Sequence, residues 1–532
     1  MTTIDANRVE IYDTTLRDGT QAQGVSFSLR DKLEIVQALD DLGVDYIEGG
    51  YPLSNPKDEQ FFHEVAGLEL KHAKIAAFGM TRRKGVKAED DTGMQALLGS
   101  EAPVVTIVGK TWNLHVRDVL RVSEDENLAM ITDSLEIMAK SGRKVFYDAE
   151  HFFDGYKADV DYALRTLRAA VEGGAKRLIL CDTNGGSSIS DIAEIIDAVA
   201  AAFPHVSLGI HCHNDSDLAV ANSITAVLHG VRQVQGTING IGERCGNADL
   251  ISIIANLALK HGFDVLRDDS LERLTATSRY IYEMANMNFR DNQPFVGSSA
   301  FAHKGGMHVH AVQRNTETYE HIAPAAVGNT RRILVSELGG RSNIAATVPA
   351  KFGLADDRDA QAKILQQVMD MENAGYEFEA AEASFEMLVR RTLGGRWYKA
   401  LWNLDHYRCE ILKRDGEAPN TEAIVKLTIG EELRHTVSEG DGPVDSLFQA
   451  LSAALRETYP HVDNIHLMDY RVRVVNTAAE TAARVRVVIE WRDARTGRCF
   501  GSVGVCENII DASWLALLDA IEYKLLNEQD KA

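Results

Sequence analysis

The sequence of 532 residues predicts an α/β fold in which an N-terminal (β/α)8 TIM barrel precedes a helical connector and a C-terminal α+β domain. Three observations predict this fold. Eight β-like runs alternate with amphipathic helical stretches between about residues 8 and 261. Polar residues gather where those runs end, on the face that carries the active site of such barrels. After about residue 408, a strand–strand–helix pattern occurs twice.

The barrel strands are expected to be short and almost continuously apolar, as in a parallel sheet that is buried on both faces. After the first strand, Ser28 and Asp31 have the spacing of a capping box, and an apolar stripe that starts at Leu29 predicts the first helix. The eight expected strands are 9–12, 45–48, 75–78, 104–108, 145–148, 177–182, 206–211 and 234–239.

The rest of the chain is expected to form two further parts. Helical patterns at 362–372 and 380–388, with a Gly- and His-rich segment at 303–310, predict connector subdomains. The C-terminal part repeats a ββα unit, which predicts a small two-layer domain with pseudo-symmetry. The predicted boundaries are 1–270 for the barrel, 271–407 for the connector and 408–532 for the C-terminal domain. The C-terminal elements are strands at 424–429, 432–439, 470–476, 483–491 and 498–506, and helices at 444–458 and 511–526.

The composition excludes some classes of function. The chain has 56 basic and 78 acidic side chains and a net charge of -22, which argues against binding nucleic acid or an anionic membrane. Six scattered cysteines without a CxxC pair indicate a reducing cytoplasm. Residues 1–8 are polar, so no signal peptide is expected, and no apolar run approaches the length of a membrane span.

Three residues from distant parts of the chain predict a divalent metal site. Residues two apart on a strand point the same way, so His211 and His213 can reach one ion while Cys212 faces away. Asp18, after the first strand, adds a carboxylate, and Asn247, after the last strand, is a possible fourth ligand. Mixed nitrogen and oxygen ligands favour Mn²⁺, Mg²⁺, Co²⁺ or Zn²⁺ at an open site over a closed structural zinc.

The competing interpretation of this pattern is a pair of ordinary core histidines. Strand-end placement and the neighbouring Arg17, which adds a fixed positive charge, make that interpretation less favourable. The Gly-rich segment 240–246 is compatible with a simple tight turn, and Glu48, Asp148 and Glu150 are compatible with simple helix caps.

At these motifs the chain resembles the α-ketoacid:acetyl-CoA aldol transferases of the DRE-TIM metallolyase superfamily, which include isopropylmalate, homocitrate and citramalate synthases. The resemblance covers nearly the whole chain, and its C-terminal part resembles the dimeric allosteric domain of isopropylmalate synthases. Within the family, the longer citramalate synthases are the most similar. The segments that carry these resemblances are 12–21, 182–185, 211–215 and 240–248 for the barrel, 440–445 and 504–514 for the C-terminal domain, and 46–52, 54–58 and 301–308 for the citramalate synthases.

The resemblance implies a metal-dependent condensation of acetyl-CoA with pyruvate, followed by thioester hydrolysis to (R)-citramalate and CoA in isoleucine biosynthesis. It also implies a homodimer with isoleucine as the probable effector at the C-terminal domain. The alternatives are 2-isopropylmalate synthase, homocitrate synthase, a cleavage enzyme like hydroxymethylglutaryl-CoA lyase, and a non-catalytic amino-acid sensor. One methylene group changes the discrimination between two substrates by only ~1–3 kcal/mol. The identity of the keto acid is therefore the hardest of these alternatives to decide from the sequence. The long C-terminal domain argues against the lyase, and the intact metal set argues against the sensor.

The resemblance also implies roles for single residues. Arg17 stabilises the developing alkoxide, and Thr183 orients the substrate carboxylate, with Glu48 and Gln21 also at the substrate. His308 and Glu150 together are expected to act as the general base. A family tyrosine aligns with Tyr319, and this chain has His310 where the relatives usually have Asp. The expected metal ligands remain Asp18, His211, His213 and Asn247.

Overall fold

The computed structural model describes residues 7–267, 270–334, 348, 352–354, 357–416, 418–475 and 483–530. The chain divides into two compact units, one of residues 1–301 with 322–330, and one of residues 302–321 with 331–532. The boundaries expected at 270 and 407 remain a prediction. Within the described residues, no helix combines the length and the apolar composition that crossing a bilayer requires.

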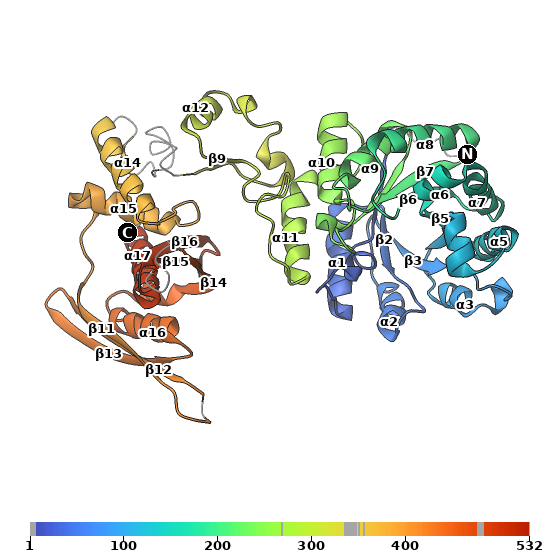
Figure 1. Ribbon diagram of the computed structural model, residues 1–532. Helices are drawn as coiled ribbons and strands as arrows, with labels where there is room; N and C mark the ends of the chain where they lie inside the picture. The colour runs from blue at the N-terminus through green and yellow to red at the C-terminus, as the bar shows by residue number, and fades with distance from the viewer. Residues whose placement is uncertain are drawn as a thin grey trace. The chain divides into compact units, whose positions relative to one another are not determined.

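The first unit is a closed barrel of eight parallel strands in the order β1 to β8, in which β8 pairs with β1 (Figure 1). The predicted (β/α)8 barrel is therefore confirmed. The last strand is shorter than expected, because the chain turns after Gly236 and Asn239 takes a left-handed conformation (φ 65°). The strands are β1 (Glu10–Asp13), β2 (Tyr46–Gly50), β3 (Lys74–Met80), β4 (Val104–Lys110), β5 (Lys144–Glu150), β6 (Arg177–Asp182), β7 (Ser207–Cys212) and β8 (Gln233–Gly236).

Helices surround the barrel. The capping box predicted for α1 is present: Asp31 N donates to Ser28 Oγ (3.2 Å), and Ser28 N donates to Asp31 Oδ2 (2.8 Å). Gly43 ends the helix in a left-handed conformation (φ 90°), which favours glycine. The helices of this unit are α1 (Leu29–Leu42), α2 (Pro56–Val65), α3 (Thr92–Gly99), α4 (Asn113–His115), α5 (Glu124–Lys140), α6 (Phe152–Ala158), α7 (Val160–Glu172), α8 (Ile189–Ala202), α9 (Ala219–Leu228), α10 (Leu250–His261) and α11 (Leu274–Met284).

Alternate residues of the barrel strands fill its interior in layers, as the pleat of a strand requires. An aromatic layer of Tyr12, Tyr46 and Phe146 closes the lower part, with ring centroids 5.3–6.2 Å apart. Two residues further along their strands, Glu48 and Asp148 are buried in the next layer. The interior therefore becomes polar toward the carboxyl ends of the strands.

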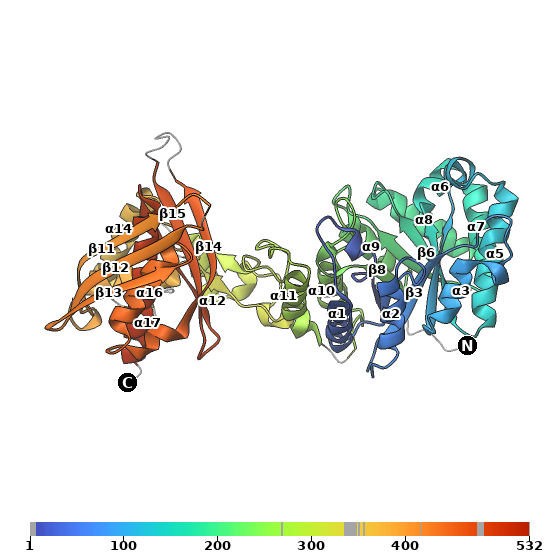
Figure 2. The ribbon, with the colours of Figure 1, turned by 90° about the horizontal axis from the view of Figure 1, so that it is seen from below.

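The second unit contains two βββα repeats rather than two ββα repeats. The first repeat includes β11 (Asn403–Leu412), a strand that the sequence pattern missed, antiparallel to β12 (Asn420–Ile429). Figure 2 shows β11–β13 and α16 in one view with β14, β15 and α17 of the second repeat. Asn476, the end of one expected strand, lies outside the described residues. The other elements are β13 (Glu432–Gly440), α16 (Pro443–Leu455), β14 (Ile465–Val474), β15 (Val485–Asp493), β16 (Cys499–Cys506) and α17 (Ile509–Gln529).

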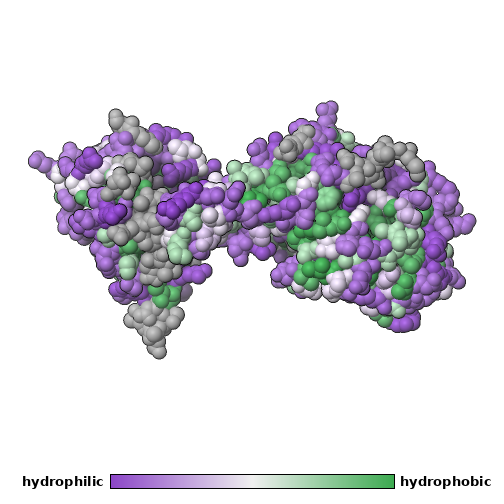
Figure 3. Space-filling model, turned by 90° about the horizontal axis from the view of Figure 1, so that it is seen from above, coloured by the Kyte–Doolittle hydropathy of each residue, from purple (hydrophilic) through white to green (hydrophobic). Residues whose placement is uncertain are grey.

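Further elements precede these repeats in the second unit. The helical patterns predicted at 362–372 and 380–388 correspond to α14 (Arg358–Asn373) and α15 (Glu382–Leu393). The other elements before them are β9 (Ala302–His303), α12 (Gly306–Arg314) and β10 (Arg332–Ile333). Figure 3 shows hydrophilic side chains over most of the visible face, with hydrophobic ones in separate patches.

Candidate metal centre and active site

The barrel brings together the three residues that the sequence predicted as metal ligands. Asp18 follows β1, His211 lies in β7 and His213 follows β7, and one ligand atom from each lies within 4.8 Å of the others. His211 Nε2 is 3.2 Å and His213 Nε2 is 4.0 Å from Asp18 Oδ2. Among the described residues, no other three histidines, cysteines or carboxylates meet this condition.

Asn247 lies beside this cluster, since it forms a β-bridge with His213. The Asn247 Oδ1 and Nδ2 atoms and His213 Nδ1 are buried and have no hydrogen-bond partner among the described residues. Buried polar atoms normally have partners, so unpaired atoms next to a carboxylate and two imidazoles fit a bound cation. Burial and the neighbouring His211 lower the pKa of His213 to about 3, which keeps that imidazole in its neutral, metal-binding form.

A buried hydrogen-bond chain orients His211. Its Nδ1 lies 2.9 Å from Gln235 Oε1, and Gln235 Nε2 donates to Asp148 Oδ1 (3.1 Å). This arrangement assigns the proton to Nδ1 and turns Nε2 toward Asp18. Gln235 was not predicted, although the two buried glutamines that alternate in β8, Gln233 and Gln235, were the available signal.

Arg17 is a fixed cation at the edge of this cluster. Its Nε donates to Glu48 Oε2 (2.5 Å), its Nη1 lies 3.5 Å from Asp18 Oδ1, and its guanidinium stacks 4.0 Å from the centroid of the Phe78 ring. Burial alone would lower the pKa of Arg17, but Asp18 and Glu48 raise it above its ordinary value. Glu48, which was expected at the substrate, also accepts a hydrogen bond from Tyr12 Oη (2.9 Å). Tyr12 therefore holds the carboxylate to which Arg17 is bonded.

Thr183 follows β6 and is held by its neighbours. Its Oγ1 accepts from the backbone N–H of His151 (2.8 Å), and its carbonyl oxygen accepts from Arg244 Nη2 (2.8 Å). Arg244 in turn donates to both carboxylate oxygens of Asp215. Gln21, the other residue expected at the substrate, is exposed in a short 3-10 helix after β1.

The glycines of the segment 240–246 place Asn247. A Cβ atom on Gly246 (φ 94°) would lie 2.1 Å from the Gly240 carbonyl oxygen, and Gly240 also has a positive φ of 67°. The segment is thus a tight turn, as one interpretation of the sequence held. The turn also places Asn247 beside His213, so the same backbone serves as a tight turn and positions a possible metal ligand.

Comparison with known proteins shows the family of the chain. The HMGL-like family matches residues 8–281, the homocitrate synthase post-HMGL domain-like family matches 295–375, and the LeuA allosteric (dimerisation) domain matches 379–525. An (R)-citramalate synthase of Aquifex aeolicus is 50% identical over 529 residues, 99% of each chain. That of Geobacter sulfurreducens is 49% identical over 526 residues, 98% of each chain. The chain belongs to the (R)-citramalate synthase family. A probable 2-isopropylmalate synthase of Methanopyrus kandleri is more distant, 33% identical over 521 residues, 97% of this chain and 98% of its own.

The expected base residues of this family member lie in different units. Glu150 ends β5 in the first unit, and its carboxylate forms an ion pair with Lys110 of β4. His308 and Tyr319 belong to the second unit, where their rings stack with centroids 4.1 Å apart. His308 is exposed on α12, and its pairing with Glu150 remains a prediction.

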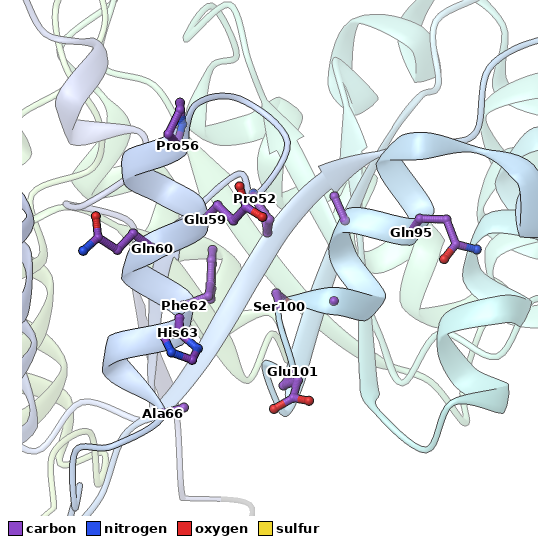
Figure 4. A pocket seen from close by; sticks show the side chains of 12 residues that line it. Pro52, Pro56, Glu59, Gln60, Phe62, His63, Ala66, Gln95, Ser100 and Glu101 are labelled. Carbon is purple, nitrogen blue, oxygen red and sulfur yellow. The ribbon is translucent and has the colours of Figure 1, made fainter.

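Two cavities accompany the barrel. One of about 730 Å³ lies between α2 and α3, where Figure 4 shows Gln60, His63 and Glu101 around it, and no predicted site residue lines it. The other, of about 640 Å³, lies where β2, β3 and β4 end, and is lined by Tyr51, Met80 and other residues after those strands. Tyr51 of this second cavity packs edge to face on Phe78, and the Arg17 guanidinium stacks on the same Phe78 ring.

Proposed function

We propose that this chain is an (R)-citramalate synthase, an acyltransferase that condenses acetyl-CoA with pyruvate, hydrolyses the thioester and supplies (R)-citramalate for isoleucine biosynthesis. Identity of 49–50% along the whole chain to citramalate synthases carries the proposal. The buried cluster of Asp18, His211 and His213 supports it, because the chemistry requires a polarised keto group.

The metal would be held by Asp18, His211 and His213, with Asn247 as a fourth ligand. A divalent ion bound there supplies Lewis acidity to the keto group of pyruvate. The oxygen and nitrogen donors favour Mn²⁺ or Mg²⁺, with Co²⁺ and Zn²⁺ as the other choices. Arg17, fixed by Glu48, stabilises the negative charge that develops on the keto oxygen.

The remaining residues around the barrel mouth bind the substrate and move protons. Thr183, fixed by the His151 N–H, orients the carboxylate of pyruvate, and Gln21 contributes from the β1 side. Removal of a methyl proton from acetyl-CoA is assigned to His308 with Glu150, and Tyr319 stacks on His308 to orient it. The resulting enolate attacks the keto carbon.

Acetyl-CoA fits the cavity at the ends of β2, β3 and β4. Its wall includes the exposed apolar side chains of Leu53 and Val119, which suit the pantetheine arm. Arg83 and Lys84 lie on its rim, where they suit phosphate groups. Tyr51 in its wall packs on Phe78, on which Arg17 also stacks, so the thioester end of the molecule is assigned to this side of the cavity.

A homodimer is supported by the second unit. Apolar side chains stand exposed on its outer strands β11, β13 and β14, a pattern that marks an interaction surface. The match of residues 379–525 to a dimerisation domain agrees with this surface. These exposed residues are Leu404, Ile411, Leu412, Leu433, Val437, Leu467, Met468, Val472 and Val474.

Isoleucine is the proposed effector, and its place is the cavity of about 620 Å³ between β11 and the N-terminus of α17. A helix N-terminus suits the carboxylate of an amino acid, and Asp511 suits its ammonium group. Isoleucine should inhibit the full-length enzyme, and Asp511→Asn should weaken that inhibition. Asp415→Asn, at an exposed site, is the matched control. Unchanged inhibition in the Asp511 variant would mean that the effector binds elsewhere.

The expected location of the protein is a reducing cytoplasm, where the six cysteines stay unpaired.

The substrate is tested by CoA release from acetyl-CoA with Mn²⁺ or Mg²⁺, comparing pyruvate, 2-ketoisovalerate and 2-ketoglutarate. Pyruvate should be preferred by the full-length protein. Asp18→Asn should abolish release, while Asp41→Asn, at a half-buried position in the last turn of α1, should leave it unchanged. Preference for 2-ketoisovalerate would assign the chain to 2-isopropylmalate synthesis, and preference for 2-ketoglutarate to homocitrate synthesis.

A further inference from the structure

A second pair of histidines lies at the barrel mouth, separate from the metal cluster. His115 ends α4 after strand β4, and His151 directly follows strand β5. Their rings are 4.3 Å apart between centroids and meet edge to face at 68°. Trp112 stacks on His115, with centroids 5.4 Å apart and an interplanar angle of 24°. No role in the proposed reaction has been assigned to these three side chains.

His151 is rigidly held. It is buried and has a left-handed backbone (φ 56°), a conformation that is uncommon for non-glycine residues. Its backbone N–H donates to Thr183 Oγ1, and its ring Nδ1 lies 3.3 Å from Asp154 Oδ2. Asp154 also accepts from Asn184 Nδ2 (2.9 Å), so the carboxylate is itself fixed. His151 therefore forms a fixed wall against which His115 packs.

The imidazole of His115, by contrast, is partly exposed and has an unpaired nitrogen. Its Nδ1 is buried and has no hydrogen-bond partner among the described residues. A π-helical turn, Val116–Leu120, follows directly, and such turns are frequent at functional sites. Burial, with the neighbouring His151, lowers the pKa of His115, so the ring is neutral and able to accept a proton at pH 7. The other charged groups that act on it are Lys110, Glu150 and Asp154.

The pair lies on the face of the barrel formed by the carboxyl ends of the strands, as the metal cluster does. Lys110 and Glu150 are register partners on β4 and β5, and His115 and His151 follow them on the two strands' loops. Glu150 lies two residues beyond Asp148 on the inward face of β5, and Asp148 accepts from the Gln235 that orients the metal-site histidine. The Glu150 carboxylate is paired with Lys110 and is assigned, with His308, to the first proton transfer, so the imidazole of His115 is the group without an assigned role in this corner.

We propose that the imidazole of His115, through its solvent-exposed edge, is the general base that activates the water for thioester hydrolysis, the second half of the reaction proposed above, on which this assignment rests. Water forms a C–O bond to the thioester carbonyl carbon and passes one proton to the His115 imidazole. The C–S bond then breaks, and the departing CoA thiolate takes that proton back. The face of Trp112 stabilises the imidazolium between the two events, and His151 keeps the ring in place.

The two halves of the reaction can be separated in the full-length enzyme loaded with Mn²⁺. In His115→Gln, single turnovers with acetyl-CoA and pyruvate, quenched in acid and followed by mass spectrometry, should accumulate the uncleaved CoA thioester of the condensation product. Carbon–carbon bond formation should stay near the wild-type rate, and CoA release should fall by about 100-fold or more, the usual worth of a general base. The wild type should lose hydrolysis below the pKa of His115, and the variant should lack this acid limb.

His205→Gln, at an exposed site, is the matched control and should behave as the wild type. If His115→Gln does not fold, Trp112→Leu removes the stacking partner and should shift the acid limb while the thioester still accumulates. Wild-type CoA release in either folded variant would overturn the assignment. Equal loss of condensation and hydrolysis without thioester accumulation would also overturn it. Failure of the proposed function would look different, since the wild type would then show no pyruvate-dependent CoA release.

Discussion

Replacing Gln235 by Leu should weaken metal binding without touching a ligand. Gln235 is fully buried, and it is the sole described link between His211 Nδ1 (2.9 Å) and Asp148 (3.1 Å). The substitution leaves one buried donor and one buried acceptor without a partner, at about 1–3 kcal/mol each, so the barrel should lose about 2–6 kcal/mol of unfolding free energy. Loss of the group that orients a ligand histidine should lower metal affinity by about 10- to 100-fold.

Isothermal titration of the metal-free, full-length protein with Mn²⁺ measures the affinity, and urea denaturation measures the stability. Gln233→Leu is the matched control, because Gln233 points the same way from the same strand but lies at the opposite end of the barrel. Among the described residues its side chain donates one hydrogen bond, a long one of 3.4 Å to Glu10, and none to the metal cluster, so its removal should leave the Mn²⁺ affinity unchanged. Wild-type affinity in Gln235→Leu would refute the reasoning.

Three further changes test other parts of the structure. Arg17→Lys should lower kcat by about 100-fold or more with little change in melting temperature, because a lysine cannot reproduce the fork of hydrogen bonds; near-normal kcat would contradict that role. Gly246→Ala should reduce Mn²⁺ affinity in the same titration, because its Cβ would meet a carbonyl oxygen at 2.1 Å, whereas Gly262→Ala, with φ 72° but open space, should cost only modest stability. Burial alone would raise the pKa of Asp493, but its hydrogen bonds, first among them that from Lys524, lower it to about 2. This folded-state pKa lies below the ordinary value, so the carboxylate stabilises the fold above about pH 4, by about 1–2 kcal/mol, and the effect is lost as the pH falls toward 2. Asp493→Asn should therefore lower the urea midpoint, followed by tryptophan fluorescence, at pH 7, and the difference should shrink in acid.

The barrel was predictable because its signals are local. Short windows of sequence contain the apolar runs that end in polar residues, the capping box at Ser28 and the His211–His213 spacing. The match of Asp18 to that pair, nearly two hundred residues apart, could be predicted because parallel strands place their carboxyl ends on one face.

Other features depend on tertiary contacts that no window contains. Strand β11 was missed because its side chains are mostly exposed on both faces, which removes the alternation that marks a half-buried strand. Glu48 was expected at the substrate, but its contact with Arg17 arises only when β1 and β2 pair. The ion pair between Glu150 and Lys110 likewise forms only because β4 and β5 pair in a register that places the two residues side by side.

The closed pairing of β8 with β1 has a consequence for how the chain acquires its ion. Asp18 leaves the ribosome early, whereas His213 and Asn247 follow only after most of the barrel has been made. A nascent chain therefore offers scattered weak ligands until the eighth strand has emerged. Tight binding begins only when the ring shuts, so metal capture should coincide with the last step of barrel folding and should report on it.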